Sequence, residues 1–457
     1  MSVDRALGSR LPSVPVPPPG PASRALAVRL ARVESRNVTF VSHDWPVFWD
    51  EASGTNVRDA DGNVFIDLTA AFGVALLGHS SRLVRAAIAR QAERVIHGMG
   101  DIHPPTAKLE LLERLCALMP WPESRAVLSS TGSEAVETAL KTTHMATGKP
   151  GVLAFEGGYH GLTLGSLAVT ERAHFRGPFV RRAYGGVAFA PFPDTRIDGA
   201  DAGAEALERI RQMLRAGAPN GDPIGAVIIE PVQARGGARI APHGFMAELC
   251  DLARDAGALV VADEIMTGLG RCGAVLASER VGLRPDVVCL GKALGGGLPL
   301  SACVAGADVM DAWPVSEGEA MHTSTFLGHP LACAVGSDFL DLVATGDVCE
   351  LAEREGSRLL EALRDELAQA DGVASVRGIG LLLGIELGRG GSRLAGAGAA
   401  IAREALGRGL IALPAGDDGH VLELTPPLGL TEEQTAFVAR ELSAAIRGAL
   451  EPAGHGA

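Results

Sequence analysis

The chain has 457 residues, of which 47% are hydrophobic and 21% are charged. These values exclude a largely disordered chain and leave enough apolar side chains for a sizeable core. Acidic residues outnumber Lys and Arg by 54 to 41, for a net charge of −13, which argues against nucleic acid as the main partner. Two features are unusual: 58 glycines and an aromatic content of only 4%.

The seven cysteines are scattered along the chain and form no CxxC pair. Such a set predicts reduced thiols in a cytoplasmic protein, not a disulfide framework. The sequence has no HExxH motif and no clustered Cys/His spacing, so we expect no metal site. No apolar run approaches the roughly 18 residues that a membrane helix needs.

The sequence pattern changes twice in the N-terminal part of the chain. Residues 1–25 contain six prolines and predict a disordered leader without a core of its own. Residues 39–68 are strand-like, and the turn signal at 59–63 predicts a hairpin. The apolar spacing over 81–95 predicts a helix.

From about residue 125 to 305, short apolar runs alternate with helical segments. Such runs, about five residues long and separated by helices, predict a mainly parallel sheet covered on both faces, with the ligand at the connections. They are 125–129, 151–155, 226–229, 258–262 and 286–290.

The sequence pattern changes again after residue 330. Long helical segments at 331–369 and 394–408 flank strand-like residues at 380–387 and 421–424. This pattern predicts a second, smaller α+β domain.

Two motifs follow the first predicted strands of the sheet. In Ser129–Ala135, Thr131 and Glu134 have capping-box spacing, and glycine with hydroxyls at a helix start can bind an anion; an ordinary helix cap is the alternative. In Phe155–Gly161, Tyr159 is one of only two tyrosines and lies between glycines. This placement indicates a stacking platform, with a simple turn aromatic as the alternative.

Two further motifs end later strands. Asp263 and Glu264 end an apolar run, and buried carboxylates need partners, such as a protonated ring nitrogen of a ligand. A helix cap or a surface turn is the alternative. Lys292 leads from a buried strand into three glycines, where an amine can become a nucleophile that forms a Schiff base. The alternative is a lysine that extends to solvent.

In this order, an anion site, a stacking aromatic, an Asp and a buried Lys are what pyridoxal phosphate requires. The chain resembles the class III, ornithine/4-aminobutyrate-type family of pyridoxal-phosphate aminotransferases from about residue 30 to 445. The family's long motif, a hydrophobic strand, Asp-Glu, a Thr-Gly turn, Pro-Asp and a Gly-Lys loop, is present from Leu259 to Pro299.

The resemblance implies the α/β architecture of fold type I. A large domain with a mainly parallel seven-stranded sheet is expected beside a smaller α+β domain built from both ends of the chain. On this basis the leader is placed at 1–25, the small domain at 26–75 and 329–457, and the large cofactor-binding domain at 76–328.

The resemblance also assigns roles to individual residues. Lys292 would form the Schiff base and carry the proton, and Asp263 would pair with the pyridine nitrogen. Thr325 would reach the phosphate of the neighbouring subunit in a homodimer. The remaining cofactor-binding residues would be Gly132, Ser133, Tyr159, His160, Glu230, Ile265 and Met266.

The chain departs from the family pattern in its substrate-facing residues. Met266 stands where the family usually has a Gln that bonds the cofactor's phenolic oxygen, and Met at this place is also found in glutamate-1-semialdehyde aminomutases. Arg235 occupies a position where the family usually has a Glu. Glu423 aligns with the Arg that usually binds the carboxylate of the substrate. The exchange either preserves a salt bridge or favours a cationic or polyol amine, unless Arg235 takes over the carboxylate. Phe72 is the third substrate residue implied by the resemblance.

We therefore expect an aminotransferase that moves an amino group from an amine or amino acid to an oxo acid or aldehyde by ping-pong chemistry. An aminomutase or an amino-acid racemase on the same fold is the alternative. A scaffold that only binds the cofactor is the third possibility, and the presence of Lys292 and Asp263 argues against it.

Overall fold

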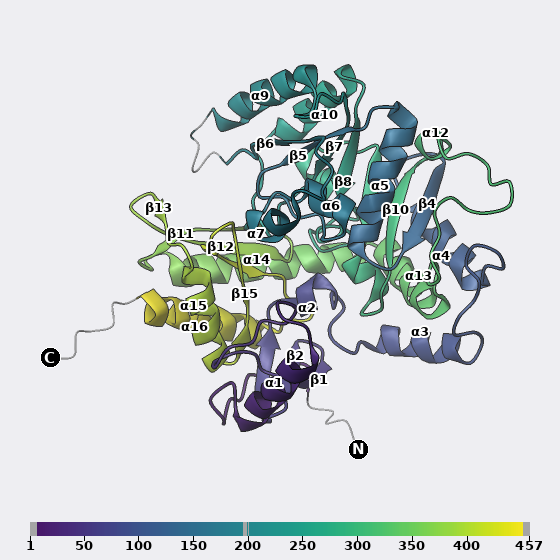
Figure 1. The fold of residues 1–457 in the computed structure, drawn as a ribbon. Coiled ribbons are helices and arrows are strands. Elements are labelled where there is room, and N and C mark those ends of the chain that lie inside the picture. Colours follow the sequence, from purple (N-terminus) through teal and green to yellow (C-terminus); the bar gives the residue numbers. More distant parts are fainter. Residues whose placement is uncertain (1–6, 195–198, 200, 451–457) are drawn as a thin grey trace. The chain divides into compact units, whose positions relative to one another are not determined.

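The computed structural model describes residues 7–194, 199 and 201–450, and the chain forms two compact units (Figure 1). The larger unit comprises residues 82–353, and the smaller one combines 1–81 with 354–457. The C-terminal segment of the smaller unit thus begins at 354, where we had expected 329. Helix α13 (Pro330–Ala344) belongs to the larger unit because it packs against α3 (Arg82–Ala92) and α4 (Thr106–Ala117).

The larger unit is built on a seven-stranded sheet in the order β4-β10-β9-β8-β7-β5-β6. Neighbours from β6 to β9 run parallel, and β10 runs antiparallel to both β9 and β4. The mainly parallel sheet expected from the sequence is confirmed. Its strands are β4 (Ser124–Ser129), β5 (Gly151–Phe155), β6 (Val187–Ala190), β7 (Ile224–Ile229), β8 (Leu259–Asp263), β9 (Val287–Leu290) and β10 (Ser301–Gly306).

All five apolar runs found in the sequence are strands of this sheet, whereas β6 and β10 were missed. Both missed strands are rich in Ala and carry a single β-branched residue each, so they give a weak strand signal. They form because neighbouring strands supply their hydrogen-bond partners.

Helix α5 (Gly132–Thr147) packs its buried face, which includes Ala135, Val136 and Ala139, against the middle of this sheet. It is the helix predicted to follow Thr131. The other helical segments of the larger unit are α6 (Leu164–Val169), α7 (Ala173–Arg176), η1 (Gly177–Phe179), α9 (Ala202–Ala216), α10 (Phe245–Asp255), α11 (Ala277–Val281), η2 (Lys292–Gly295) and α12 (Ala307–Met310).

The smaller unit contains two sheets and is the expected α+β domain. One has the order β1-β2-β3-β14, and its β2–β3 pair is the predicted hairpin; the other has the order β11-β12-β16-β15, with β13 on β12. The strands are β1 (Trp49–Ser53), β2 (Asn56–Asp59), β3 (Val64–Asp67), β11 (Val373–Ile379), β12 (Leu382–Arg389), β13 (Ser392–Arg393), β14 (Leu410–Ile411), β15 (Leu413–Ala415) and β16 (Val421–Leu424).

The helices of the smaller unit include α1 (Pro21–Val33), α15 (Ala397–Gly407) and α16 (Glu432–Leu450). Helix α14 (Asp347–Leu367) begins before the boundary between the units and ends after it. The single long helical segment expected at 331–369 is therefore two helices, broken at Thr345-Gly346. Among the described residues, no helix is long and apolar enough to cross a membrane.

The described part of the proline-rich leader, from residue 7, is ordered and differs from our expectation. Ser13 pairs with Val64 through both backbone hydrogen bonds. The Asn56 side chain accepts the amides of Gly8 and Arg10, and helix α1 begins at Pro21, within the expected disordered segment. Prolines lose little backbone freedom on folding, and several of the other amides of the segment find acceptors on the β2–β3 hairpin. Residues 1–6 lie outside the described residues.

A left-handed turn, labelled α2 (Ala70–Gly73), follows β3. The φ angles of Ala70, Ala71 and Phe72 are 45°, 48° and 62°, a region that costs non-glycine residues about 1–2 kcal/mol each. Buried Asp67 holds the turn, since its carboxylate accepts the amides of Thr69 (2.8 Å) and Ala71 (3.0 Å). The same carboxylate lies 2.8 Å from the imidazole of His79.

Replacement of Asp67 should therefore destabilise the smaller unit. In Asp67→Ala, the His79 ring and the amides of Thr69 and Ala71 lose their partner while the strain of the turn remains. We expect a loss of about 3 kcal/mol in the free energy of unfolding, measured by urea denaturation. The matched control is Asp371→Ala, which removes an exposed carboxylate paired with Arg389 and should change the midpoint far less. Equal midpoints for the two variants would contradict the role of Asp67.

Candidate active site

The motif residues found in the sequence meet in one cavity of about 240 Å³ in the larger unit. The cavity lies where β4, β5, β7, β8 and β9 end, the edge at which an α/β sheet places its ligand. Its lining residues are Gly132, Ser133, Tyr159, His160, Gly161, Glu230, Ala234, Arg235, Asp263, Ile265, Met266 and Lys292.

The N-terminus of α5 forms one wall. Thr131 and Glu134 make the predicted capping box: the Thr131 side chain accepts the amide of Glu134 at 3.3 Å, and the Glu134 carboxylate accepts the amide of Thr131 at 2.9 Å. Gly132 and Ser133, which come first in the helix, carry amides with no acceptor in the helix itself. Together with the helix dipole these amides suit a phosphate group.

Two glycines let the backbone approach the cavity closely. A Cβ on Gly132 would lie 2.9 Å from Ile265 Cδ1. A Cβ on Gly161, whose φ is +121°, would lie 2.1 Å from the Ser133 hydroxyl. Side chains at these two positions would therefore displace cavity walls.

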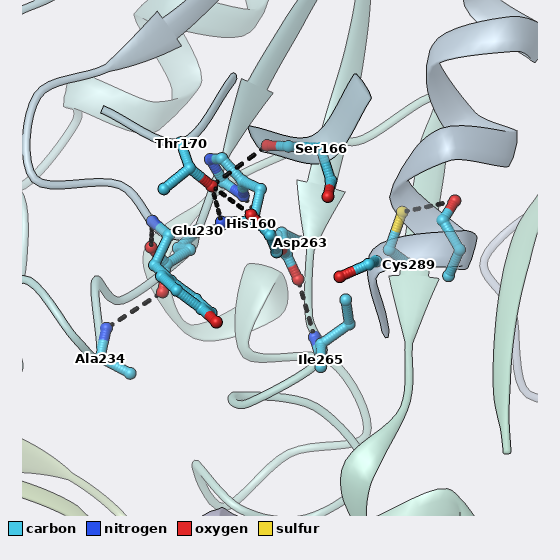
Figure 2. Close-up of polar contacts among 12 residues, drawn as sticks. His160, Ser166, Thr170, Glu230, Ala234, Asp263, Ile265 and Cys289 are labelled. Carbon is cyan, nitrogen blue, oxygen red and sulfur yellow. Dashed lines mark hydrogen bonds and ion pairs between the residues drawn. The ribbon is translucent and has the colours of Figure 1, made fainter. Parts of the chain in front are cut away.

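A buried ion pair lies at the end of β8. His160 Nδ1 is 2.7 Å from Asp263 Oδ2, and both side chains are less than 5% exposed (Figure 2). Burial by itself would lower the pKa of His160, but the bond to Asp263 and the negative charge of Asp263 outweigh it, so the pKa is raised. The His160 ring thus holds its proton more tightly than a free imidazole does, and the short contact fixes where the Asp263 side chain lies.

Further hydrogen bonds fix the orientation of this pair. The other oxygen of Asp263 accepts the amide of Ile265 at 3.1 Å, and the His160 amide donates to Thr170 Oγ1 at 2.9 Å (Figure 2). Among the described residues, His160 Nε2 is buried without a hydrogen-bond partner. A carboxylate fixed in this way inside a cavity suits a protonated ring nitrogen.

Lys292 lies at the start of η2, directly after β9 and Gly291. Its side chain lines the cavity and is half-buried. Its φ of 43° is unusual for a residue with a side chain and costs about 1–3 kcal/mol. Strain of this kind marks a position that the surrounding structure enforces.

Tyr159 and Glu230 form the remaining polar wall. Burial raises the pKa of the Tyr159 hydroxyl, although the positive charges of Arg235 and Arg172 oppose the shift. The Tyr159 ring packs edge-on against Phe175, with 5.6 Å between centroids. Burial raises the pKa of Glu230 to about 7, although the positive charge of His160 opposes it.

Three predicted residues do not line this cavity. Thr325 is exposed, in the segment that precedes α13. Glu423 is buried on β16 of the smaller unit, and Phe72 is 63% exposed at the left-handed turn of that unit. The roles assigned to them by resemblance stay predictions.

Sequence reasoning assigned no role in the site to two supporting residues, Ala234 and Thr170. Ala234 lines the cavity and donates its backbone amide to Glu230 Oε2, a role that no side-chain pattern can indicate. Thr170 lies at the end of α6, and its hydroxyl bonds back to the His160 segment. For Thr170 the signal available in the sequence was the Val169-Thr170 pair, which resembles the transaminase branch of the family.

Comparisons with known proteins identify the family. A family model described as class-III aminotransferase matches residues 39–446. The acetylornithine aminotransferase of Methanopyrus kandleri is 34% identical over 403 residues, which are 88% of this chain and 95% of that protein. The 4-aminobutyrate aminotransferase of Mycobacterium leprae is 33% identical over 431 residues, which are 92% of this chain and 94% of that protein.

Solved structures agree with this result. An amine transaminase from an uncultivated Pseudomonas species, in its PLP-bound form, superposes with a TM-score of 0.82 at 28% identity, over 91% of this chain and 99% of that one. A Bacillus anthracis aminotransferase superposes with a TM-score of 0.85 at 25% identity, over 93% and 98% of the two chains.

The chain belongs to the class-III aminotransferase family. The resemblance seen in the sequence and the fold type are confirmed, and the reaction class is amino-group transfer. Pyridoxal phosphate is the cofactor on which this family depends. The matched relatives are named for different amines, so the substrate is a separate question.

Proposed function

We propose that the protein binds pyridoxal phosphate in the cavity of its larger unit and transfers an amino group between an amine or amino-acid donor and an oxo acid or aldehyde. One observation carries this proposal: Lys292, the His160–Asp263 ion pair and the N-terminus of α5 line a single cavity. These groups suit an aldehyde, a pyridine nitrogen and a phosphate respectively.

Each wall of the cavity then has a task. When bound, the cofactor supplies an electron-poor ring that stabilises negative charge at the neighbouring substrate carbon. The amides of Gly132 and Ser133 bind the phosphate, and Asp263, oriented by His160, keeps the ring nitrogen protonated. Tyr159 and Ile265 supply an aromatic and an aliphatic surface that exclude water from the ring.

Lys292 is the proton carrier of the proposed reaction. Its Nζ takes the proton from the donor carbon, holds it inside the cavity, and returns it to the other carbon along the reacting system. A single amine that takes and returns the proton needs no second acid, and the fixed backbone at Lys292 limits where Nζ can lie. The residue that bonds the cofactor and the residue that moves the proton are thus the same.

Reductive trapping tests the proposal directly. The chain has only four lysines, namely Lys108, Lys141, Lys149 and Lys292. Borohydride treatment of the protein with pyridoxal phosphate should leave a pyridoxyl group on Lys292, found by peptide mass spectrometry, and on none of the other three. Lys292→Ala should lose the label and at least about a thousandfold in transamination, because the nucleophile and the proton carrier disappear together.

The same preparation separates transamination from the alternative reactions. An aminotransferase needs an oxo acid or aldehyde acceptor to turn over, whereas an aminomutase or racemase completes its cycle without one. Met266 lines the cavity where a hydrogen-bonding residue is usual, and this is the observation that keeps the alternative open. Turnover that persists after every oxo compound is removed would favour the aminomutase or racemase.

We also propose that the protein works as a homodimer in the cytoplasm and that Thr325 completes the phosphate site of the neighbouring subunit. Thr325 is exposed and lies beside the exposed apolar residue Phe326, as suits a contact with a second copy. All seven cysteines are free thiols, which suits a reducing compartment.

Mixing two impaired variants tests the shared site. Thr325→Ala should bind pyridoxal phosphate about tenfold more weakly, since it loses a hydrogen bond to a charged group. When Thr325→Ala and Lys292→Ala chains are dissociated and reassociated in equal amounts, half of the dimers are mixed, and each has one intact site. Activity at limiting cofactor should then rise to about a quarter of the wild-type value. No rise above the separate variants would contradict a shared site.

The substrate remains the finer part of the proposal. Arg235 lines the cavity and Glu423 is buried on β16, so both exchanged charges lie at sites with restricted access to water. We propose that this exchange favours a cationic or polyol amine donor over a plain α-amino acid. The competing interpretation, a salt bridge kept for structure, predicts no such preference.

A charge reversal at Glu423 distinguishes the two interpretations. If Glu423 disfavours carboxylates, Glu423→Arg should raise kcat/KM for ordinary α-amino-acid donors by about tenfold or more, because a repelling charge becomes an attracting one. The preferred amine, found by a donor screen that includes ω-amino acids, diamines and amino sugars, should react no faster. Loss of turnover with all donors, together with a lower unfolding temperature, would support the structural salt bridge.

A further inference from the structure

Two loops that border the cavity are joined by one buried side chain. Glu230, at the end of β7, accepts the Tyr159 amide at 3.0 Å through Oε1 and the Ala234 amide at 3.1 Å through Oε2 (Figure 2). A second tether runs alongside, since Gln233 Nε2 donates to the carbonyl of Glu156 at 2.8 Å. The loop after β5 and the loop after β7 are therefore fixed to each other across a short distance.

The two loops carry groups with different tasks. The loop after β5 supplies the Tyr159 ring, and the loop after β7 supplies Arg235, and both side chains line the cavity. A shift of either loop would move the ring surface relative to the guanidinium. The geometry of the ring and that of the substrate end are thus coupled through Glu230.

The chemistry of this junction requires a carboxylate. Both oxygens accept amide hydrogen bonds at the same time, which an ionised carboxylate does well. A neutral acid loses part of its acceptor capacity to its own proton, and an amide side chain has one acceptor and one donor. Glu230 is 5% exposed, so its charge is kept in a costly environment for the sake of these bonds.

We propose that Glu230 is a positioning residue that holds the Tyr159 loop and the Arg235 loop in register for pyridoxal phosphate, and that protonation of Glu230 loosens this hold. We name Glu230 and its two amide donors, Tyr159 and Ala234, the Glu230 clasp. The inference rests on the proposed function, because it concerns the site that would receive the cofactor.

The titratable and charged groups that share the cavity with Glu230 come from several elements. His160 and Tyr159 belong to the loop after β5, Asp263 to the end of β8, Arg235 to the loop of Glu230 itself, and Lys292 to η2. Burial raises the pKa of Glu230 to about 7, the positive charge of His160 lowers it, and the negative charge of Asp263 raises it further. The clasp is therefore complete above about pH 7 and weakened below it.

Two readouts should then respond to pH in opposite directions. Because the pKa of folded Glu230 lies above its unfolded value near 4.5, its contribution to stability is present at low pH and is lost as pH rises through 7. Cofactor binding, by contrast, should gain from the ionised clasp. Rising pH should thus tighten the binding of pyridoxal phosphate while it lowers the stability of the apoprotein.

The experiment compares wild type with Glu230→Gln. The dissociation constant of pyridoxal phosphate is measured on apoprotein by tryptophan fluorescence, from pH 6 to 8. We expect Glu230→Gln to bind at least tenfold more weakly than wild type at pH 8, where Glu230 is ionised, and less than threefold more weakly at pH 6. The titrations of the cofactor and of other residues cancel when the dissociation constant of the variant is divided by that of wild type. The unfolding midpoint of apo wild type should fall relative to Glu230→Gln over the same range.

Matched variants separate the clasp from general damage. Glu137→Gln makes the same chemical change at a carboxylate outside the cavity, which accepts the Gly165 amide at 2.8 Å. The dissociation constant of this variant, divided by that of wild type, should stay near one at every pH. Gln233→Leu cuts the second tether without removing a titrating group, so it should weaken binding equally at pH 6 and 8. If Glu230→Gln does not fold, Glu230→Asp, too short to reach both amides, should show the tenfold loss at pH 8.

The clasp would be overturned if the dissociation constant of Glu230→Gln, divided by that of wild type, did not change with pH. It would also be overturned if Glu230→Gln or Glu230→Asp bound the cofactor as tightly as wild type at pH 8. Its failure can be told from failure of the proposed function. If wild type is not labelled at Lys292 by reductive trapping, the cofactor proposal fails. If wild type is labelled and the Glu230 variants bind cofactor equally well, only the clasp fails.

Discussion

The buried ion pair between His160 and Asp263 is the interaction on which the rest of the site depends. Two titratable side chains that are less than 5% exposed are stable in such a place only when each satisfies the other. The pair joins the loop after β5 to the end of β8, and Thr170 and the Ile265 amide fix its two members from opposite sides. The result is an Asp263 side chain held at a fixed place at the end of β8.

Around this pair the sheet places the other groups by strand order alone. Five strands that point the same way end at one edge, so residues more than 150 positions apart in the chain line one cavity. The loops carry the side chains that bind or react, and the strand ends fix where those side chains lie. This division explains why the cavity combines strained or tightly packed backbone, as at Lys292 and Gly132, with a regular framework beneath it.

Much of this could be predicted from the sequence, for a physical reason. Asp263 and Lys292 end apolar strands, and the Thr131–Glu134 cap starts a helix, so local pattern and chemistry point to the same places. What could not be predicted depends on partners distant in sequence. The ordered leader requires the Asn56 side chain, and β10 requires its two neighbours. The left-handed turn at Ala70–Phe72 contradicts the usual preferences of its residues and exists because Asp67 holds it.

The lone antiparallel strand, β10, has a consequence for motion. It starts directly after the Lys292 loop and returns beside the strand that precedes it, so that Ala302 lies opposite Leu290. Ser301 also donates a hydrogen bond to the Thr131 carbonyl at 2.6 Å. Lys292 thus lies in a short loop whose two ends continue into the paired strands β9 and β10, and such anchoring limits how far the loop can open on its own. We therefore expect the amide hydrogens of β9 and β10, the paired strands on either side of this loop, to exchange slowly with solvent.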